Sequence, residues 1–265
     1  MEKSSLSNSL DLRNKLRNRE LMFAGWVSYA HPSIVETFGR AGFDFMLIDM
    51  EHSTISIEQA QRIIASSQSL NTPCIPRPVS HSNDYIKPLL ESGSDGILIQ
   101  MVETPFQVQK IIDHTKYPPI GLRTYGVNRA QGYGFDFDAY TRDWNVSSSL
   151  MIQIESVQGV QNIDEILAFS EVDAVMIGPL DLAGSLGVPG QTNHPKVLEA
   201  SKIVIESCRK KGISCGTQLS SVSKSSVDHM FDLGYTYIIL GSDLFVLYEW
   251  SRQMHDLIHS IKISK

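Results

Sequence analysis

The chain has 265 residues, of which 42% are hydrophobic and 20% charged, and its formal net charge is −6. This length allows one large α/β domain or two small ones, and single α/β barrels commonly reach about 250 residues. The acidic balance, without any block of like charges, argues against a nucleic-acid-binding or membrane-surface protein, because both rely on a basic patch. No apolar run approaches the roughly 20 residues that a membrane-spanning helix needs.

The first twenty residues are polar and serine-rich and lack the apolar core of a secretory signal. We expect residues 1–20 to form a tail or a helix outside the barrel proposed below. The three cysteines, Cys74, Cys208 and Cys215, have no metal-type spacing and cannot all pair with one another, so they are interpreted as reduced thiols. A cytoplasmic protein is expected.

Eight short apolar runs follow one another along the chain, and each is succeeded by a segment with helical spacing. Near-continuous hydrophobicity predicts strands buried on both faces, as in a parallel sheet covered by helices. Eight strand–helix units predict a single (β/α)8 barrel over residues 21–265. An open doubly wound sheet is the alternative, but YAHPS (29–33) is not its Gly-rich phosphate loop. The runs are MFAGWVS (22–28), FMLIDM (45–50), PCIPRP (73–78), GILIQM (96–101), LMIQIES (150–156), AVMIGP (174–179), ISCGTQL (213–219) and YIILGS (237–242).

The regular spacing is interrupted between the fourth and fifth runs, which are separated by residues 102–149. Segments of this length in compact domains are usually functional or disordered. Aromatic residues, glycines and arginines indicate an ordered cover loop. Arg123, Tyr125 and Arg129 are its candidates for recognising a carboxylate, a phosphate or sugar hydroxyls, either in the same chain or across a subunit interface.

Polar side chains stand at the ends of several predicted strands, and the catalytic groups of a barrel gather at this C-terminal face. Because the strand ends meet at one mouth, residues far apart in the sequence are expected to lie together. They are Asp49, Glu51 and His52 in and after the second run, Arg77 in the third, Gln153 and Glu155 in the fifth, Leu180 and Asp181 after the sixth, and Gln218 in the seventh.

Glu155 and Asp181 are candidate metal ligands. A carboxylate that closes the apolar run MIQIE would be costly to desolvate without a partner, and Mg²⁺ typically takes one or two protein carboxylates together with waters. Asp181 has an alternative role as the cap of a helix that begins after Gly178, because Asp is a favoured N-cap residue. The two acids alone leave both interpretations open.

His52 and Arg77 add chemical roles to these acids. His52 offers a base that can be tuned near pH 7, and Arg77 offers a fixed cation for developing negative charge. Glu91, in LLESG (89–93), could bond the second ring nitrogen of His52. Taken singly, His52 could be a structural histidine and Arg77 part of a salt bridge. None of the twelve lysines falls inside an apolar run, which argues against a Schiff-base aldolase.

With these motifs in place, the chain resembles the HpcH/HpaI family of class II, metal-dependent pyruvate aldolases from about Met22 to Leu247. The combination of motifs is specific, whereas any one fragment would be weak. It implies a TIM barrel of the phosphoenolpyruvate/pyruvate type. The motifs, in family order, are FDFMLIDMEHS (43–53), the RP of PCIPRP, LLESG, GILIQMVET (96–104), YPPIGLR (117–123), IQIES (152–156) and IGPLDLAGSLGVPGQTNHP (177–195).

The resemblance also implies roles for individual residues. Glu91 stands where we expect Asp more often in the family, and Glu is one methylene longer. The implied roles are His52 as catalytic base with Glu91 as its supporting acid, Arg77 as the cation that stabilises the enolate, Glu155 and Asp181 as metal ligands, and Gln153, Leu180 and Asp181 as contacts of the 2-oxo acid.

The implied function is cleavage or formation of 4-hydroxy-2-oxo acids, including 2-keto-3-deoxy sugar acids. Pyruvate and an aldehyde would arise through a pyruvate enolate bound to Mg²⁺, Mn²⁺ or Co²⁺. The alternatives are another enolate-forming lyase or decarboxylase, acting on oxaloacetate or on a malyl or citryl thioester, and a non-catalytic barrel subunit. Family members usually form hexamers that exchange a C-terminal helix, and residues 245–265 have helical spacing compatible with such a homo-oligomer.

Overall fold

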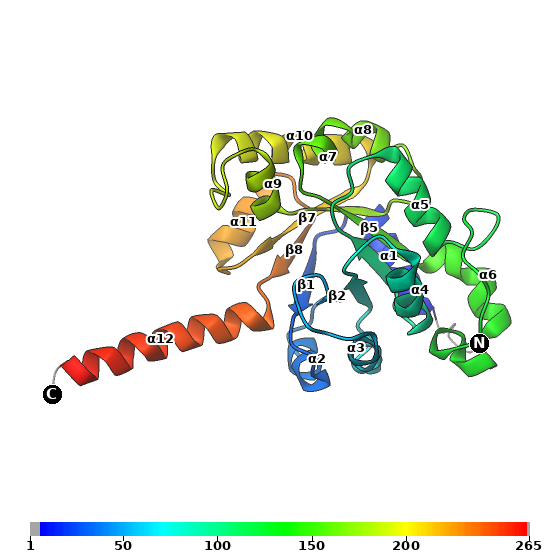
Figure 1. The fold of residues 1–265 in the computed structure, drawn as a ribbon, viewed down its shortest axis with the longest axis horizontal. Coiled ribbons are helices and arrows are strands. Elements are labelled where there is room, and N and C mark those ends of the chain that lie inside the picture. The colour runs from blue at the N-terminus through cyan, green and yellow to red at the C-terminus, as the bar shows by residue number, and fades with distance from the viewer. Residues whose placement is uncertain (1–5, 264–265) are drawn as a thin grey trace.

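A computed structural model of the chain describes residues 6–263 and shows eight parallel strands with helices outside them (Figure 1). Neighbouring strands are hydrogen-bonded in the order β3-β2-β1-β8-β7-β6-β5-β4. The amide of Asp95, next to β4, donates to the carbonyl of Cys74 in β3 at 3.0 Å, so the two ends of the sheet meet and the barrel is nearly closed. The predicted (β/α)8 barrel is confirmed. The strands are β1 (Met22–Val27), β2 (Phe45–Asp49), β3 (Cys74–Arg77), β4 (Gly96–Ile99), β5 (Ser149–Ile154), β6 (Ala174–Ile177), β7 (Ser214–Leu219) and β8 (Tyr237–Leu240).

The helices begin and end at residues with local causes. α3 and α5 start with capping boxes, and α10 ends at Gly212, whose φ of 70° lies in the left-handed region that glycine adopts without a Cβ clash. The helices are α1 (Ser7–Arg17), α2 (Pro32–Gly39), α3 (Ile57–Ser69), α4 (Asn83–Glu91), α5 (Pro105–Thr115), the 3-10 helix η1 (Arg129–Gly134), α6 (Phe137–Ser147), α7 (Val157–Gln161), α8 (Ile163–Ile166), α9 (Pro179–Ser185), α10 (Pro195–Lys211), α11 (Lys224–Asp232) and α12 (Asp243–Ile263).

The strands are buried on both of their faces. Inward-facing side chains fill the barrel, where Phe45 and Tyr237 meet edge to face with ring centroids 5.8 Å apart. Outward-facing aliphatic side chains pack beneath the helices in a second cluster. This two-sided burial explains why the strands appear in the sequence as continuous apolar runs rather than as alternating patterns.

The helix α1 closes the N-terminal end of the barrel. Leu12 and Leu16 are buried in the interior cluster, and Arg13 Nε lies 2.9 Å from the buried Oδ1 of Asp173. The helix that the sequence predicts within residues 1–20 is therefore present, but it packs into the end of the barrel rather than apart from it. Residues 1–5 of that segment lie outside the described range.

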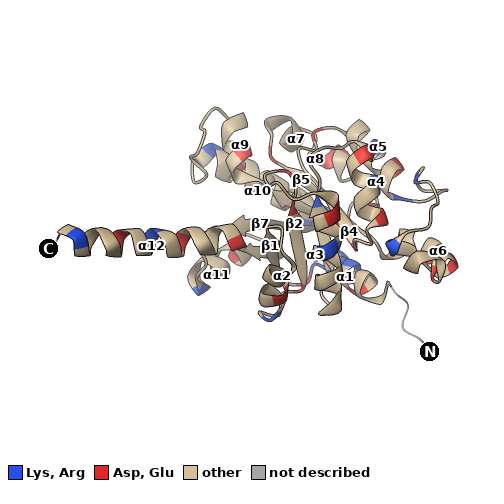
Figure 2. Cartoon of the chain, turned by 60° about the horizontal axis from the view of Figure 1, so that its bottom comes forward, with Lys and Arg blue, Asp and Glu red and all other residues tan. Residues whose placement is uncertain are grey.

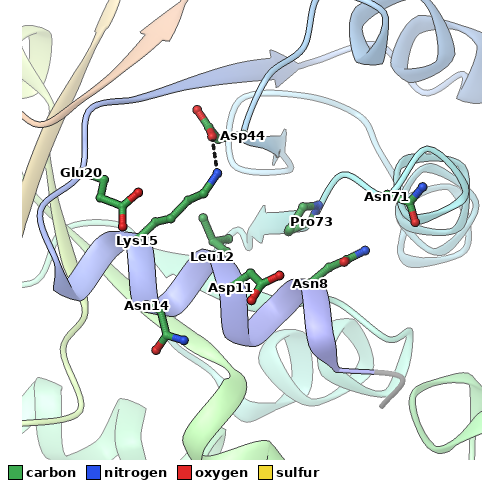
Figure 3. A pocket seen from close by; sticks show the side chains of 9 residues that line it. All are labelled: Asn8, Asp11, Leu12, Asn14, Lys15, Glu20, Asp44, Asn71 and Pro73. Carbon is green, nitrogen blue, oxygen red and sulfur yellow. Dashed lines mark hydrogen bonds and ion pairs between the residues drawn. The ribbon is translucent and has the colours of Figure 1, made fainter. Parts of the chain in front are cut away.

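A polar cavity of about 360 Å³ lies beside α1 (Figure 3). Lys15 Nζ reaches Asp44 Oδ1 there at 2.7 Å. None of the predicted site residues lines this cavity. It lies at the N-terminal end of the barrel, whereas those residues follow the C-terminal ends of the strands, so it is not the predicted site.

The interval 102–149 is not one continuous loop, because it contains α5, η1 and α6. Its middle part, residues 116–148, runs from the end of α5 to the start of β5 and therefore belongs to the N-terminal end of the barrel. Within one chain it cannot cover the mouth formed by the C-terminal strand ends. The sequence analysis missed α6 because its buried positions are the large aromatics Tyr140 and Trp144, one helical turn apart between polar residues.

The helix α12 extends away from the barrel (Figure 1). Asp243 at its first position is the one buried residue that it contributes within the described range. Acidic and basic residues are distributed over many elements of the chain rather than gathered on one (Figure 2). None of the helices within residues 6–263 combines the length and the apolar character that crossing a membrane requires. The three cysteines are free thiols and buried.

Lys116, directly after α5, is almost completely buried. Its Nζ donates to the carbonyl oxygen of Ser148 at 2.8 Å and to the Oγ of the same residue at 2.7 Å. Burial, the largest cause, lowers the pKa of Lys116 from 10.5 to about 7. The charges of Arg13 and Arg17 act in the same direction, and Asp173 opposes them. The folded chain therefore holds this proton less tightly than the unfolded chain does.

This difference predicts a pH-dependent stability. Between about pH 7 and 10.5 the unfolded state binds more protons at this position, so the contribution of Lys116 to the free energy of unfolding rises with pH, with a slope of up to about 1.4 kcal/mol per pH unit. Below pH 7 the penalty is fully present. We expect Lys116→Met to flatten the stability curve measured by urea unfolding at pH 7, 8, 9 and 10. Lys211→Met, at an exposed position, is the control and should leave the slope unchanged; equal slopes for wild type and Lys116→Met would contradict the prediction.

Candidate active site

A cavity of about 420 Å³ lies at the C-terminal ends of the strands. Side chains from β1, β2, β3, β5 and β7 and from the segments after β6 and β8 line it. It brings together most of the residues that the sequence analysis places at this mouth. Those that line it directly are Asp49, His52, Arg77, Gln153, Leu180, Asp181 and Gln218.

Asp49 organises the end of β2. It stands opposite Arg77 in the register of β2 and β3, and its Oδ1 accepts from Arg77 Nη2 at 2.7 Å. The same oxygen accepts from the backbone amides of Glu51 and His52, each at 3.1 Å. One buried carboxylate therefore fixes both the guanidinium and the turn that carries His52.

Arg77 is held from several sides. Its Nη1 lies 2.9 Å from Glu51 Oε2, and its guanidinium carbon stands 4.7 Å above the centre of the Trp26 ring. The same Nη1 donates to Gln153 Oε1 at 3.3 Å. The ion pair with Glu51 is poorly aligned for a hydrogen bond, and Glu51 Oε2 is buried without a hydrogen-bond partner among the described residues. Burial, opposed mainly by Arg77, raises the pKa of Glu51.

Glu155 follows β5 and is almost completely buried. Its Oε1 accepts from the amide of Met101 at 2.8 Å, and its Oε2 accepts from Gln153 Nε2. Met101 has a φ of 47°, an uncommon conformation for a non-glycine residue, and this conformation aims its N–H at the carboxylate. Burial, first of all, raises the pKa of Glu155 to about 7, and the nearby carboxylates of Asp181 and Glu51 act in the same direction.

The donor set fits a hard divalent cation. Glu155 and Asp181 supply two carboxylates, a number that suits Mg²⁺ with waters completing its shell. Their mutual repulsion is what a positive charge between them would relieve. Within residues 6–263 no three His, Cys, Asp or Glu side chains are close enough to form a metal cage by themselves. The fit is therefore that of an open site rather than a closed structural one.

Gly178 makes room for this arrangement. A Cβ on Gly178 would lie 2.3 Å from Glu155 Oε2 and 2.7 Å from Gln153 Nε2. Any larger residue must displace one of these two groups. The glycine of the GP dipeptide is thus required by close approach of side chains, since its φ of −97° is accessible to every residue.

Asp181 lies in the first turn of α9 and does not cap it. The N-cap is Gly178, which makes no side-chain cap bond. The alternative interpretation of Asp181 as an N-cap is therefore wrong, and the residue is exposed at the cavity beside Leu180. Leu180 has 64% of its surface exposed, so an apolar side chain is offered to whatever enters the cavity.

His52 projects into the mouth with a largely free ring. Its side chain is 64% exposed, and its Nε2 lies 3.8 Å from Glu51 Oε2. The carboxylate nearest to it in the described chain is thus Glu51 rather than Glu91. Its backbone is fixed by Asp49, whereas its ring remains available for proton transfer.

Glu91 is not in this cavity. It ends α4, which runs antiparallel to the strands, so it lies towards the opposite end of the barrel. Glu91 Oε1 pairs with Arg123 Nη2 at 3.0 Å, and the contact between Glu91 and His52 is not made within the described chain.

The two arginines of the interval 102–149 have structural partners. The guanidinium carbon of Arg123 lies 4.7 Å from the ring centre of Tyr117 and 4.6 Å from that of Trp144. Arg129 donates to the carbonyl of Ser92 and to the side chain of Gln68, each at 2.9 Å. Tyr125 is exposed and stacks on Tyr117. Neither arginine lies in the cavity, which contradicts a role for them in recognising substrate within their own chain.

Trp26, Met101 and Gly178 are site residues that the sequence analysis did not assign. Trp26 precedes the end of β1 and could have been found as an aromatic residue at a strand end. Met101 acts through its backbone, and Gly178 acts through the absence of a side chain. Neither of these properties produces a signal in residue type.

The fold and this cavity define an α/β-barrel enzyme with an arginine and a carboxylate pair at the mouth, and comparison with known proteins gives the family. The sequence model of the HpcH/HpaI aldolase/citrate lyase family matches residues 22–249. The chain belongs to that family.

Individual relatives agree. The chain is 34% identical over 238 residues to a hydroxypyruvate/pyruvate aldolase of Roseobacter denitrificans, covering 89% of this chain and 91% of the relative. It is 31% identical over 233 residues to the 2-keto-3-deoxy-L-rhamnonate aldolase of Escherichia coli K12, covering 87% and 86%. A crystal structure of an HpcH/HpaI aldolase/citrate lyase family protein from Burkholderia cenocepacia J2315 superposes with a TM-score of 0.87 at 27% identity, covering 94% and 99%.

The close approach at Gly178 gives a test of the site geometry. Gly178→Ala is expected to push Glu155 or Gln153 aside and to lower kcat/KM for the reaction proposed below by roughly 100-fold, since an ångström of misplacement has effects of that order. The far-ultraviolet circular dichroism and the unfolding midpoint should change little. Gly184→Ala, in α9 with no atom within 4 Å of its added Cβ, is the matched control. Wild-type kinetics of Gly178→Ala would show that this contact is not critical.

Proposed function

We propose that the chain is a class II aldolase that cleaves 4-hydroxy-2-oxo acids to pyruvate and an aldehyde and also catalyses the reverse addition. The observation that carries the proposal is the juxtaposition of Arg77, Gln153 and Glu155 in one buried hydrogen-bonded row, with Asp181 and His52 at its edge. Relatives named as pyruvate and 2-keto-3-deoxy sugar acid aldolases support the same reaction class.

The row of Arg77, Gln153 and Glu155 can stabilise the negative charge of an enolate. A divalent cation such as Mg²⁺, Mn²⁺ or Co²⁺, held by Glu155 and Asp181, would provide Lewis-acid stabilisation of negative charge. Gln153 fixes the orientation of Glu155, because its amide nitrogen donates to the carboxylate while its oxygen accepts from Arg77. Arg77 offsets negative charge that develops on the keto oxygen as the C3–C4 bond breaks. Its two acidic partners keep the guanidinium in place for this role.

His52 acts as the general base for the C4 hydroxyl group. In cleavage its imidazole takes the proton of the C4 hydroxyl, C4 becomes the aldehyde carbonyl, and the electron pair of the C3–C4 bond passes to the pyruvate enolate. Return of this proton from His52 to C3 of the enolate then gives pyruvate and restores the neutral imidazole. A Schiff-base route is disfavoured, because no lysine is among the described residues that line the cavity.

The test measures pyruvate release from a panel of 4-hydroxy-2-oxo acids with Mg²⁺ or Mn²⁺ and again with EDTA. We expect release that depends on the metal ion, and a decrease in kcat of at least about 100-fold in His52→Ala, as is typical of the loss of a general base. His229→Ala, on the exposed face of α11, is the control and should behave as wild type. Metal-dependent pyruvate binding without release from any substrate would favour another enolate lyase. If pyruvate is neither released from any substrate nor bound, the enzyme assignment is overturned.

We further propose that α12 joins copies of the chain into a cytosolic homo-oligomer, with a hexamer as the expected form. Its apolar side chains are spaced alternately by three and four residues, as in the seam of a coiled coil. In the described chain these side chains are largely exposed, which is unfavourable for a helix in water. The seam residues are Leu247, Trp250, Met254, Leu257 and Ile261.

If these seam residues form the subunit interface, charged substitutions among them should separate the subunits. Leu257→Glu with Ile261→Glu would place two carboxylates in the interface, and burying an unpaired charge is strongly unfavourable. We expect a lower molar mass by size-exclusion chromatography with light scattering, whereas His259→Glu, on the opposite face of α12, should keep the wild-type mass. A wild-type chain that is itself a monomer would contradict the proposal.

A further inference from the structure

The cavity at the strand ends has two halves of different chemistry. Glu51, Glu155 and Asp181 gather with Asp49 and Arg77 on the side formed by β2, β3, β5 and the segment after β6. The opposite side is formed by the ends of β7, β8 and β1. Its polar groups are hydroxyls and one amide, and its apolar groups are the side chains at the start of α12. They are Ser28, Gln218, Ser220, Ser242, Leu244 and Phe245.

This second side, here called the neutral half, has no positive charge to offer. Of the described residues that line the cavity, Arg77 alone carries a permanent positive charge, and it is already paired with Asp49 at 2.7 Å and Glu51 at 2.9 Å. Behind the neutral half lies another acid, Asp243, whose carboxylate accepts from the amides of Ser28 and Tyr29. A second anionic group on a substrate would therefore meet negative potential and no counter-ion.

The neutral half does have unused hydrogen-bonding groups. Within residues 6–263 the hydroxyls of Ser28 and Ser220, and that of Thr192 on the adjoining loop, make no hydrogen bond to another group. Gln218 uses its amide nitrogen on the carbonyl of Gly241 at 3.2 Å, which leaves its amide oxygen as an acceptor. Sites built from such groups recognise substrate hydroxyls well, because an analogue without them leaves polar groups unpaired.

We propose that the aldehyde half of the substrate is an uncharged hydroxyaldehyde, bound in the neutral half by hydrogen bonds to its hydroxyls and by contact with Leu244 and Phe245. This inference rests on the aldolase function proposed above and narrows it. Aldehydes that end in a carboxylate or a phosphate are disfavoured, because the described residues of the neutral half supply no cation. The 2-oxo acid carboxylate, in contrast, belongs to the half that contains Arg77.

The experiment compares three aldehydes that differ only at the third carbon, each added to pyruvate with Mg²⁺ present. They are 2-hydroxypropanal, 2,3-dihydroxypropanal and 2-hydroxy-3-oxopropanoate, so the terminal group is methyl, hydroxymethyl or carboxylate. We expect kcat/KM, followed as pyruvate consumption, to be at least about tenfold higher for the two neutral aldehydes, a difference that corresponds to about 1.4 kcal/mol. An equal or higher value for the carboxylated aldehyde overturns the inference and leaves the aldolase function intact. If pyruvate is not consumed with any of the three aldehydes, the proposed aldolase function is overturned and this inference with it.

The second part of the experiment introduces a positive charge into the neutral half. Ser220→Lys supplies the missing cation at an exposed position after β7 and should raise the ratio of kcat/KM for the carboxylated over the dihydroxylated aldehyde by about tenfold. Ser220→Gln removes the same hydroxyl and adds comparable length without charge, so it is the variant against which the ratio in Ser220→Lys is compared. If Ser220→Lys and Ser220→Gln give the same ratio, the aldehyde does not bind in the neutral half.

Discussion

The ion pair between Asp49 and Arg77 is the interaction on which the site depends. It joins neighbouring strands at the same level of the barrel, in a nearly water-free position where either charge alone would be costly. Because the Asp49 oxygen that accepts from Arg77 also accepts from the amides of Glu51 and His52, the pair sets the turn after β2 as well. The guanidinium on β3 and the backbone that carries His52 after β2 are thus positioned by a single carboxylate.

Around this pair the chain concentrates negative charge that it does not neutralise. Four carboxylates, those of Asp49, Glu51, Glu155 and Asp181, lie around the one guanidinium of Arg77. Burial, first of all, raises the pKa values of Glu51 and Glu155, and the neighbouring carboxylates act in the same direction. A fold selected for stability alone would have little reason to keep such an arrangement in a buried place. It is what the proposed aldolase site would require, because a bound divalent cation and a developing enolate would share the charge. The uncommon backbone conformation at Met101 belongs to the same arrangement, because its N–H donates to Glu155.

The sequence was informative where the candidate site residues are side chains at strand ends. The register of a parallel barrel brings Asp49 beside Arg77 and Gln153 near Glu155 without any special feature of the loops, so reading the ends of the apolar runs was sufficient. The sequence was misleading where the direction of a helix decides which end of the barrel a residue reaches. Glu91 and Arg123 belong to motifs of the family, yet α4 and the segment after α5 carry them to the other end of the barrel, where they pair with each other. Periodicity within a helix does not reveal which end of the barrel that helix reaches.

The start of α12 connects assembly with the cavity. Asp243 accepts from the amides of Ser28, Tyr29 and Leu244, which fixes the direction of the helix relative to the end of β1. The next two residues, Leu244 and Phe245, line the cavity, and the apolar seam begins only two positions later. The wall of the cavity and the start of the exposed seam therefore lie less than one helical turn apart on the same helix. In the oligomer proposed above, docking of α12 onto a second copy would place the subunit contact beside the wall of the cavity, so that assembly would bear on the site as well as on stability.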